Sequence, residues 1–202
     1  MSDVGSTVEV AGLVLAAGRG RRMGRPKVLM RHPNGAGFLD SAVSALVDGG
    51  CNEVVVVVGA AGAAARGEMS PELAVLERRR RLHFHQLSDW SAGIGSSLVA
   101  GLGVLPRHAQ AVAIMLVDLP DVDARVVRRV LDLASPNVLA RATYAGRPGH
   151  PVLVGRIHWT GIQDEATDRE GAKAYLDNRG ALPIPCDDLA TGRDVDRPED
   201  LL

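Results

Sequence analysis

The chain has 202 residues, of which 46% are hydrophobic and 3% aromatic, so the sequence predicts one domain with an aliphatic core. A formal net charge of −1 argues against a general nucleic-acid binder, and no apolar run has the length of a membrane span. Two cysteines in unrelated contexts do not make a disulfide framework, and the polar N-terminus has no signal-peptide layout. We therefore expect a soluble cytoplasmic protein, a single domain over residues 1–202, with no nucleic-acid or membrane partner.

Four apolar runs predict the strands of a buried sheet. Three of them are nearly continuous in β-branched or aliphatic residues, namely Val8–Leu15, Glu53–Val58 and Ala111–Val117. Leu82–Gln86 is a shorter candidate strand. Runs without polar alternation are typical of parallel strands that are buried on both faces.

Three stretches with helical spacing of apolar residues lie between or after these runs, at 38–47, 94–105 and 123–133. Gly49-Gly50 follows the first as a helix stop, and Asp123 is a candidate N-cap for the third. The alternation of strands and helices predicts an α/β protein with a doubly wound, mostly parallel sheet of the Rossmann-like kind.

The last third of the chain has a different pattern. Short strands are expected at 138–143 and 152–154, around a Gly/Pro-rich turn at 146–151. A helix is expected at 170–178 and a short strand at 182–186. These elements predict a smaller mixed C-terminal lobe placed against the parallel sheet.

A glycine-rich, basic loop follows the first predicted strand. Ligands of open parallel sheets bind at the carboxyl ends of the strands, and glycines there let phosphate oxygens approach backbone N–H groups. The loop also supplies charge-assisted donors from Arg19, Arg21, Arg22, Arg25 and Lys27. These features predict a polyphosphate site.

Two common phosphate sites do not fit this loop. The P-loop requires Lys-Ser or Lys-Thr, which the sequence lacks, and the spacing of Gly18, Gly20 and Gly24 is one residue too long for the dinucleotide fingerprint. A tight turn with solvated arginines is the alternative interpretation. Five basic residues after one buried strand argue against that alternative.

The run Leu15–Lys27 (LAAGRGRRMGRPK) resembles the LAAG-x-[SG]-x-RMG-x-x-K signature of the nucleotidyltransferase superfamily that activates sugars and cofactors. The resemblance implies catalytic roles for Arg22 and Lys27 on the triphosphate. It also implies contacts with the base, ribose and phosphates of an NTP from Leu15, Ala16, Ala17, Gly18, Arg19, Gly20 and Lys27.

Asp118-Leu-Pro120 follows the strand at Ala111–Val117. A carboxylate at the carboxyl end of a strand, beside a triphosphate site, is a natural Mg²⁺ ligand. In isolation, Asp-x-Pro is a weak signal, and a capped turn would be its explanation in most sequences. Because the glycine-rich loop is in the same chain, we expect Asp118 to bind Mg²⁺ and to act in catalysis.

A second Gly/Ser loop, Ser88–Ser97, opens a predicted helix whose N-terminal amides can bind an anion, although Ser96 and Ser97 could instead be simple N-caps. The segment resembles the N-P-x-W-x-x-G-M-G-S-S stretch of the molybdenum cofactor cytidylyltransferase family, with Ile94 in place of the common Met. This resemblance implies that Gly95, Ser96 and Ser97 bind the nucleotide.

Tyr144–Pro151 (YAGRPGHP) matches the Y-x-G-R-x-G-H-P-V segment of the same family, although an ordinary surface hairpin is the alternative. The resemblance places this segment on the acceptor side, where a phosphorylated pterin would bind. It implies acceptor-binding roles for Arg147, Gly149 and His150.

The C-terminal run from Asp194 to Asp200 (DVDRPED) matches the family's D-[IV]-D-T-P-E-D ending, with Arg197 in place of the usual Thr. The resemblance implies that Asp196 is the second carboxylate on Mg²⁺, while a role for Asp194 stays open.

The resemblance covers Val8–Leu202 and implies Mg²⁺-dependent transfer of CMP from CTP to molybdopterin, with release of pyrophosphate and delivery of the product to a molybdenum hydroxylase. Ala17 favours cytidylyl over guanylyl transfer. A guanylyl- or sugar-phosphate nucleotidyltransferase is the nearest alternative. A nicotinamide-nucleotide-dependent oxidoreductase and a non-catalytic scaffold are alternatives of other classes. The glycine spacing argues against the oxidoreductase, and the pair Asp118 and Asp196 argues against the scaffold.

Overall fold

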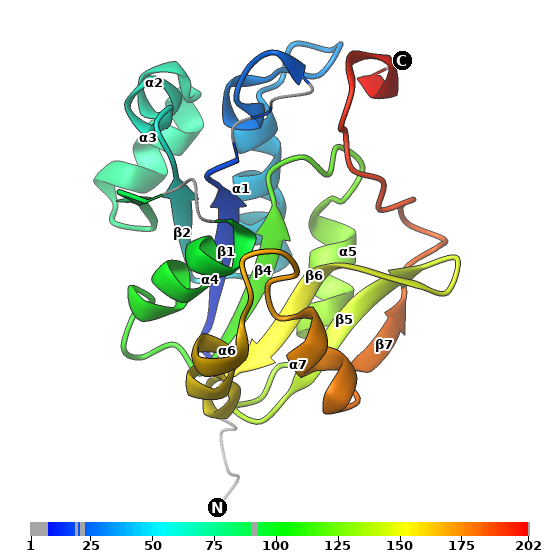
Figure 1. Cartoon of the computed structure of the whole chain (residues 1–202). Helices are drawn as coiled ribbons and strands as arrows, with labels where there is room; N and C mark the ends of the chain where they lie inside the picture. The colour runs from blue at the N-terminus through cyan, green and yellow to red at the C-terminus, as the bar shows by residue number, and fades with distance from the viewer. Residues whose placement is uncertain (1–7, 19, 21–22, 90–92, 202) are drawn as a thin grey trace, which may run out of the picture.

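The computed structural model describes residues 8–18, 20, 23–89 and 93–201 of the chain (Figure 1). A seven-stranded sheet forms its centre, with the strand order β3-β2-β1-β4-β6-β5-β7. Every neighbouring pair that excludes β6 is parallel, and β6 is antiparallel to both β4 and β5. The strands are β1 (Val10–Ala16), β2 (Glu53–Val58), β3 (Leu82–Gln86), β4 (Ala111–Leu116), β5 (Leu139–Tyr144), β6 (Arg147–Gly155) and β7 (Leu182–Pro185).

Helices cover both faces of this sheet (Figure 1). One hydrophobic core receives side chains from α1 (Phe38–Gly49), α2 (Gly62–Glu68), α3 (Pro71–Arg78) and α5 (Ala124–Leu131). The core on the other face receives side chains from α4 (Ile94–Gly103), α6 (Trp159–Glu165) and α7 (Lys173–Asn178). Short 3-10 turns lie at η2 (Lys27–Leu29), η3 (Arg156–His158) and η4 (Pro198–Leu201). The doubly wound, mostly parallel α/β fold predicted from the sequence is confirmed.

The first strand, β1, is buried on both of its faces, as the two layers of helices require. All seven residues of β1 are buried, and their side chains alternate between the two cores. Val10, Val14 and Ala16 pack on the side of α1, while Ala11, Leu13 and Leu15 pack on the side of α4. A continuous apolar run is therefore what a central parallel strand requires.

The C-terminal part differs from the prediction at the hairpin between β5 and β6. The expected turn at 146–151 is wrong: the hairpin turns at Ala145 and Gly146, which have positive φ, and Arg147–Pro151 belong to β6. Pairing of Tyr144 with Arg147 and of Thr143 with Pro148 carries the ladder up to the turn. The mixed C-terminal strands thus extend the main sheet through the β4–β6 pair.

Three helices were not predicted from the sequence, namely α2, α3 and α6. A signal existed for α3, because Ser70 accepts a hydrogen bond from the Leu73 N–H and Pro71 occupies the first helical position. Within the described part of the chain, no helix combines the length and the apolarity that crossing a membrane requires.

Leu13 offers a direct test of the two-sided core. Its side chain is fully buried between the sheet and α4, so Leu13→Ala should lower the free energy of unfolding by about 2–5 kcal/mol. Leu133→Ala is the matched control, because Leu133 is 44% exposed and its truncation should cost less than about 1 kcal/mol. Urea unfolding of both variants gives the comparison, and equal costs would contradict the assigned core.

Candidate functional site

A cavity of about 280 Å³ opens at the carboxyl ends of β1 and β4. One wall is the glycine-rich loop after β1, the opposite wall is the start of α4, and the floor is the end of β4. The lining residues are Leu15, Ala16, Ala17, Gly18, Gly20, Lys27, Gly93, Ile94, Ser97, Leu116, Val117 and Asp118. The structure therefore brings most of the predicted nucleotide-facing residues to one place.

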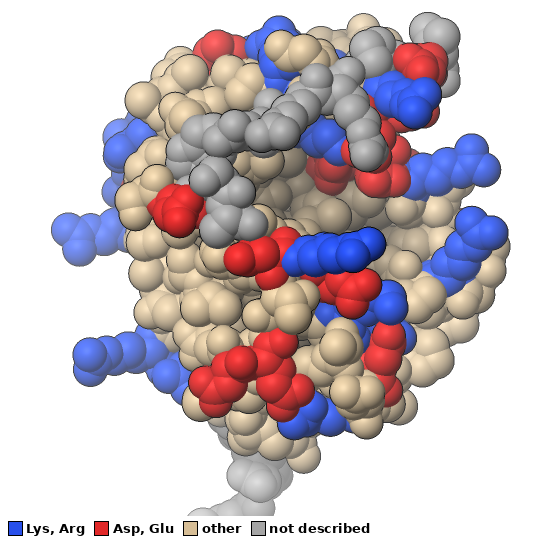
Figure 2. All heavy atoms as spheres, viewed as in Figure 1, with Lys and Arg blue, Asp and Glu red and all other residues tan. Residues whose placement is uncertain are grey.

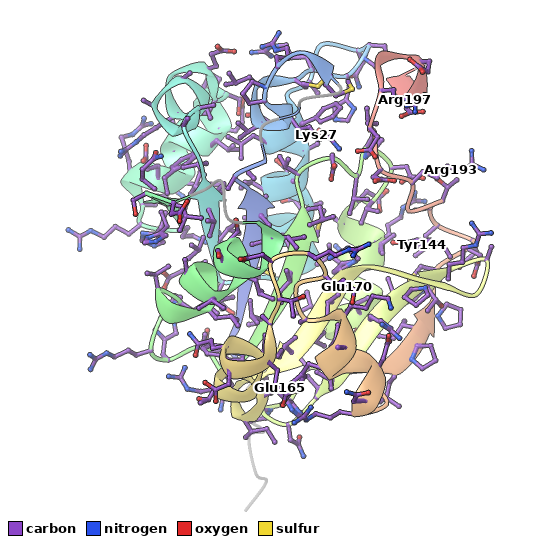
Figure 3. All side chains as sticks on the ribbon, in the orientation of Figure 1. Lys27, Tyr144, Glu165, Glu170, Arg193 and Arg197 are labelled. Atoms are coloured by element: carbon purple, nitrogen blue, oxygen red, sulfur yellow. The ribbon has the colours of Figure 1, made fainter. Side chains whose placement is uncertain are left out.

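Lys27 lies between two carboxylates at the rim of this cavity, near the C-terminal segment (Figure 3). Its Nζ donates to Asp118 Oδ2 at 2.5 Å and to Asp196 Oδ1 at 2.6 Å. Burial acts to lower the pKa of Lys27, but the hydrogen bonds and charges of the two aspartates outweigh it and raise that pKa above its usual value. The ammonium is thus held in its charged form.

A third carboxylate completes an acidic cluster of Asp118, Asp194 and Asp196. Ligand oxygens of the three side chains lie within 4.8 Å of one another. The backbone places them there, because the Val195 N–H donates to the Asp118 carbonyl at 3.0 Å and the Val195 side chain is buried. The two aspartates that flank Val195 are therefore carried to the end of β4.

This cluster fits a divalent cation. Asp118 is only 8% exposed, and its buried Oδ1 has no hydrogen-bond partner among the described residues. Taken together, the ammonium of Lys27 and the three carboxylates have a formal charge of −2. Hard cations such as Mg²⁺ and Mn²⁺ prefer carboxylate oxygens of this kind.

A second cavity, of about 310 Å³, adjoins the first. Leu15 and Ile94 line both cavities, so ligands in the two would meet at these residues. Gly149 and His150, predicted on the acceptor side, line this second cavity. Much of its remaining wall is apolar and comes from Leu98, Ile114, Val152 and Leu176.

Arg147 lies apart from Gly149 and His150. It lines a third cavity, of about 570 Å³, together with Arg193 and Asp194. Because Asp194 also belongs to the acidic cluster, this third cavity lies next to the carboxylates. The predicted acceptor residues are thus divided between two cavities. On the face seen in Figure 2, acidic and basic side chains gather around a hollow near the middle of the molecule.

His150 is held in its neutral form. Burial lowers the pKa of His150 to about 4, so the imidazole carries no charge at neutral pH. It can exchange a hydrogen bond with a ligand, but it would not supply a positive charge to a phosphate.

The three predicted nucleotide ligands at the start of α4 face different partners. Ser97 lines the first cavity, and its Oγ donates to the Gly93 carbonyl at 3.2 Å. Ser96 instead bonds to Asp168, and Gly95 packs directly against the backbone of Thr167. Asp168 was not predicted as a site residue, because no pattern in its polar surroundings distinguishes it.

Three predicted donors of the glycine-rich loop lie outside the described part of the chain, namely Arg19, Arg21 and Arg22, as does Trp90 of the second loop. Their roles stay predictions.

The fold and the cavity above the carboxyl ends of β1 and β4 define a nucleotide-binding α/β protein of the NTP-transferase class. Residues 12–182 match the model of the MobA-like NTP transferase domain, and the chain belongs to this family. The superfamily predicted from the sequence motifs is therefore confirmed.

Known proteins of similar sequence or structure span nearly the whole chain. The nicotine blue oxidoreductase of Paenarthrobacter nicotinovorans is 32% identical, over 95% of this chain and 94% of that protein. Rv0371c from Mycobacterium tuberculosis H37Rv has a TM-score of 0.80 at 23% identity, over 96% of both chains. A structure of Rv0371C in complex with manganese has a TM-score of 0.71 at 21% identity, over 90% of this chain and 89% of that one.

Lys27 and a divalent cation would share the same carboxylate oxygens. We expect Lys27→Met to bind Mn²⁺ several-fold more tightly than the wild type, because a competing positive charge is removed from the cluster. Lys173→Met is the matched control, since Lys173 pairs with Asp177 away from the cluster. Titration followed by electron paramagnetic resonance measures the affinity, and weaker binding by Lys27→Met would contradict this arrangement.

The lowered pKa of His150 predicts that the stability of the fold depends on pH. Its folded pKa of about 4 lies below the ordinary value of 6.5, so the unfolded chain takes up a proton first as the pH falls. The free energy of unfolding should therefore decrease between about pH 6.5 and pH 4, and His150→Gln should weaken this decrease. Urea titrations across this range test it, and an unchanged slope in the variant would contradict a lowered pKa for this imidazole.

Proposed function

We propose that this chain transfers a nucleotidyl group from an NTP, with CTP as the first choice, to a phosphorylated pterin. The acceptor phosphate would attack the α-phosphorus of the NTP, forming a new P–O bond as the bond to the leaving pyrophosphate breaks. The observation that carries the proposal is the acidic cluster with Lys27 at the rim of the glycine-lined cavity. The buried Oδ1 of Asp118, for which the described residues offer no hydrogen-bond partner, adds to this support.

Asp118 and Asp196 would hold the divalent ion, Mg²⁺ in the first instance, and Asp194 is near enough to join them. When bound, such an ion neutralises charge on phosphate oxygens. The manganese in the complex of the structural relative Rv0371C is consistent with a divalent ion in this fold.

The glycine-rich loop would hold the nucleotide. Gly18 and Gly20 line the cavity, so their backbone N–H groups would receive phosphate oxygens, and Leu15–Ala17 would face the base and ribose. Lys27 would balance charge on the triphosphate, with Arg19 and Arg22 as further proposed donors. Electrostatic stabilisation and positioning then account for catalysis, and an acceptor phosphate requires no general base.

The second cavity would receive the acceptor ring. Its apolar walls suit a flat heteroaromatic system, and it meets the nucleotide cavity at Leu15 and Ile94. We place Gly149 and His150 against this ring, with His150 as a neutral hydrogen-bonding partner. Arg147 would contact an anionic part of the acceptor from the third cavity. We further propose a cytoplasmic enzyme, acting as a single domain, that delivers its product to a molybdenum hydroxylase.

One observation favours a second candidate function. The relative from Paenarthrobacter nicotinovorans is a nicotine blue oxidoreductase, and the identity of 32% extends over 95% of this chain. An apolar cavity beside a nucleotide site would equally suit reduction of a flat heteroaromatic ring by a nicotinamide nucleotide. An acidic cluster that fits a divalent cation has no evident use in such a hydride transfer, so we rank this function second.

Binding measurements separate the two functions. Calorimetry with CTP, GTP, ATP, UTP and NADPH, each with and without Mg²⁺, should show the tightest binding for CTP and a loss of that binding without metal. Tight NADPH binding that is independent of metal would contradict the proposal and favour the oxidoreductase.

Asp118→Asn tests the metal ligand directly. We expect CTP-dependent release of pyrophosphate to fall about 100-fold or more, because the buried carboxylate that would hold the divalent ion is lost. Asp132→Asn, an exposed residue after α5, is the matched control and should retain activity. Wild-type turnover in Asp118→Asn would contradict the assignment.

A further inference from the structure

The loop between α6 and α7 crosses the N-terminal end of α4 (Figure 1). We call residues 166–172 the crossover loop. Thr167 and Gly171 exchange two backbone hydrogen bonds, of 3.1 and 2.8 Å, and the Glu170 N–H donates to Thr167 Oγ1 at 3.2 Å. These bonds close the loop on itself, so it meets α4 in a defined shape.

Asp168 of the crossover loop caps α4 from 72 positions away in the sequence. Its Oδ1 accepts from the Ser96 backbone N–H at 3.0 Å and from Ser96 Oγ at 2.6 Å. Its carbonyl accepts from the Ile94 N–H at 3.1 Å. The first backbone N–H groups of a helix have no acceptor within the helix. Here a residue that is distant in sequence provides the acceptor oxygens.

Two glycines of the second loop admit this contact. A Cβ on Gly93 would overlap the carbonyl of Asp168, and a Cβ on Gly95 would overlap the backbone of Thr167. Gly93 also has a φ of +148°, which side chains other than hydrogen rarely allow. The approach of the crossover loop is thus a physical reason for glycine at both positions.

The capped helix end and the crossover loop contribute to different cavities. Gly93, Ile94 and Ser97 line the first cavity, while Glu170, Gly171 and Ala172 of the crossover loop line the second. Ile94 lines both. Asp168 therefore ties the wall of one cavity to the wall of the other.

We propose that Asp168 is a positioning residue: through its hydrogen bonds to Ser96, it holds the first turn of α4 as the wall of the nucleotide cavity. The inference rests on the proposed function for the identity of that ligand. It also assigns Ser96 a different role, because Ser96 would act through Asp168 and not by touching the nucleotide.

Variants at the two positions test the proposal. Asp168→Ala should raise the Kd for CTP with Mn²⁺ about tenfold and should speed hydrogen exchange at the Ser96 amide. Asp168→Asn keeps the Oδ1 acceptor and should recover most of the affinity. Asp164→Ala, which removes an exposed carboxylate near the crossover loop, is the matched control and should bind CTP as the wild type does. Melting temperatures of all variants report any general loss of structure.

A double variant at positions 96 and 168 shows whether Ser96 acts through Asp168 or contacts the nucleotide directly. If Ser96 acts through Asp168, then Ser96→Ala combined with Asp168→Ala should bind CTP no more weakly than Asp168→Ala alone. Additive losses would contradict the proposal, because they would mean that Ser96 contacts the nucleotide directly. Ser96→Ala and Asp168→Asn also provide milder variants if Asp168→Ala does not fold.

Two outcomes separate this inference from the proposed function. A wild-type chain that does not bind CTP with Mn²⁺ contradicts the proposed function, and the inference with it. A wild-type chain that binds CTP, together with an Asp168→Ala variant of unchanged Kd, contradicts only the inference, even if exchange at the Ser96 amide becomes faster.

Discussion

A carboxylate buried at the end of a central strand is the constraint on which the site depends. Asp118 is 8% exposed, so its charge has lost most of its hydration and requires a nearby cation. Lys27 supplies one such charge from the loop after β1. The Val195 N–H, bonded to the Asp118 carbonyl, brings two more carboxylates to the same point. The result is an excess of negative charge that an ammonium alone does not balance.

Three distant parts of the chain meet at this point, namely the loop after β1, the end of β4 and the C-terminal segment. Two cavities extend from the β1 loop and the start of α4, and they share Leu15 and Ile94. A glycine-lined cavity beside an apolar one is suited to a transfer between two bound molecules. The Asp168–Ser96 contact joins the walls of both, so under the proposed function it would help to set the spacing between nucleotide and acceptor.

Sequence reasoning reached the sheet and Asp118 through local patterns, whereas Asp196 came from the resemblance of the C-terminal run to the family's ending. The run EVVVVV predicts a buried parallel strand without knowledge of its neighbours, and β2 is found at Glu53–Val58. The β6 strand was missed at 147–151 because its prolines and glycines indicate a turn, whereas pairing with β5 decides the outcome. Asp168 could not be predicted, since its role arises only when residue 168 meets residue 96 in three dimensions.

The central claim is that the cluster at Asp118 and Asp196 holds a divalent ion against a nucleotide. The most direct measurement is anomalous diffraction at the manganese edge from crystals grown with Mn²⁺ and a non-hydrolysable CTP analogue. We predict one manganese peak within coordination distance of both carboxylates and of the phosphates, with Lys27 Nζ turned toward the triphosphate. A bound nucleotide with no manganese at these carboxylates, and with Lys27 still between them, would contradict the account.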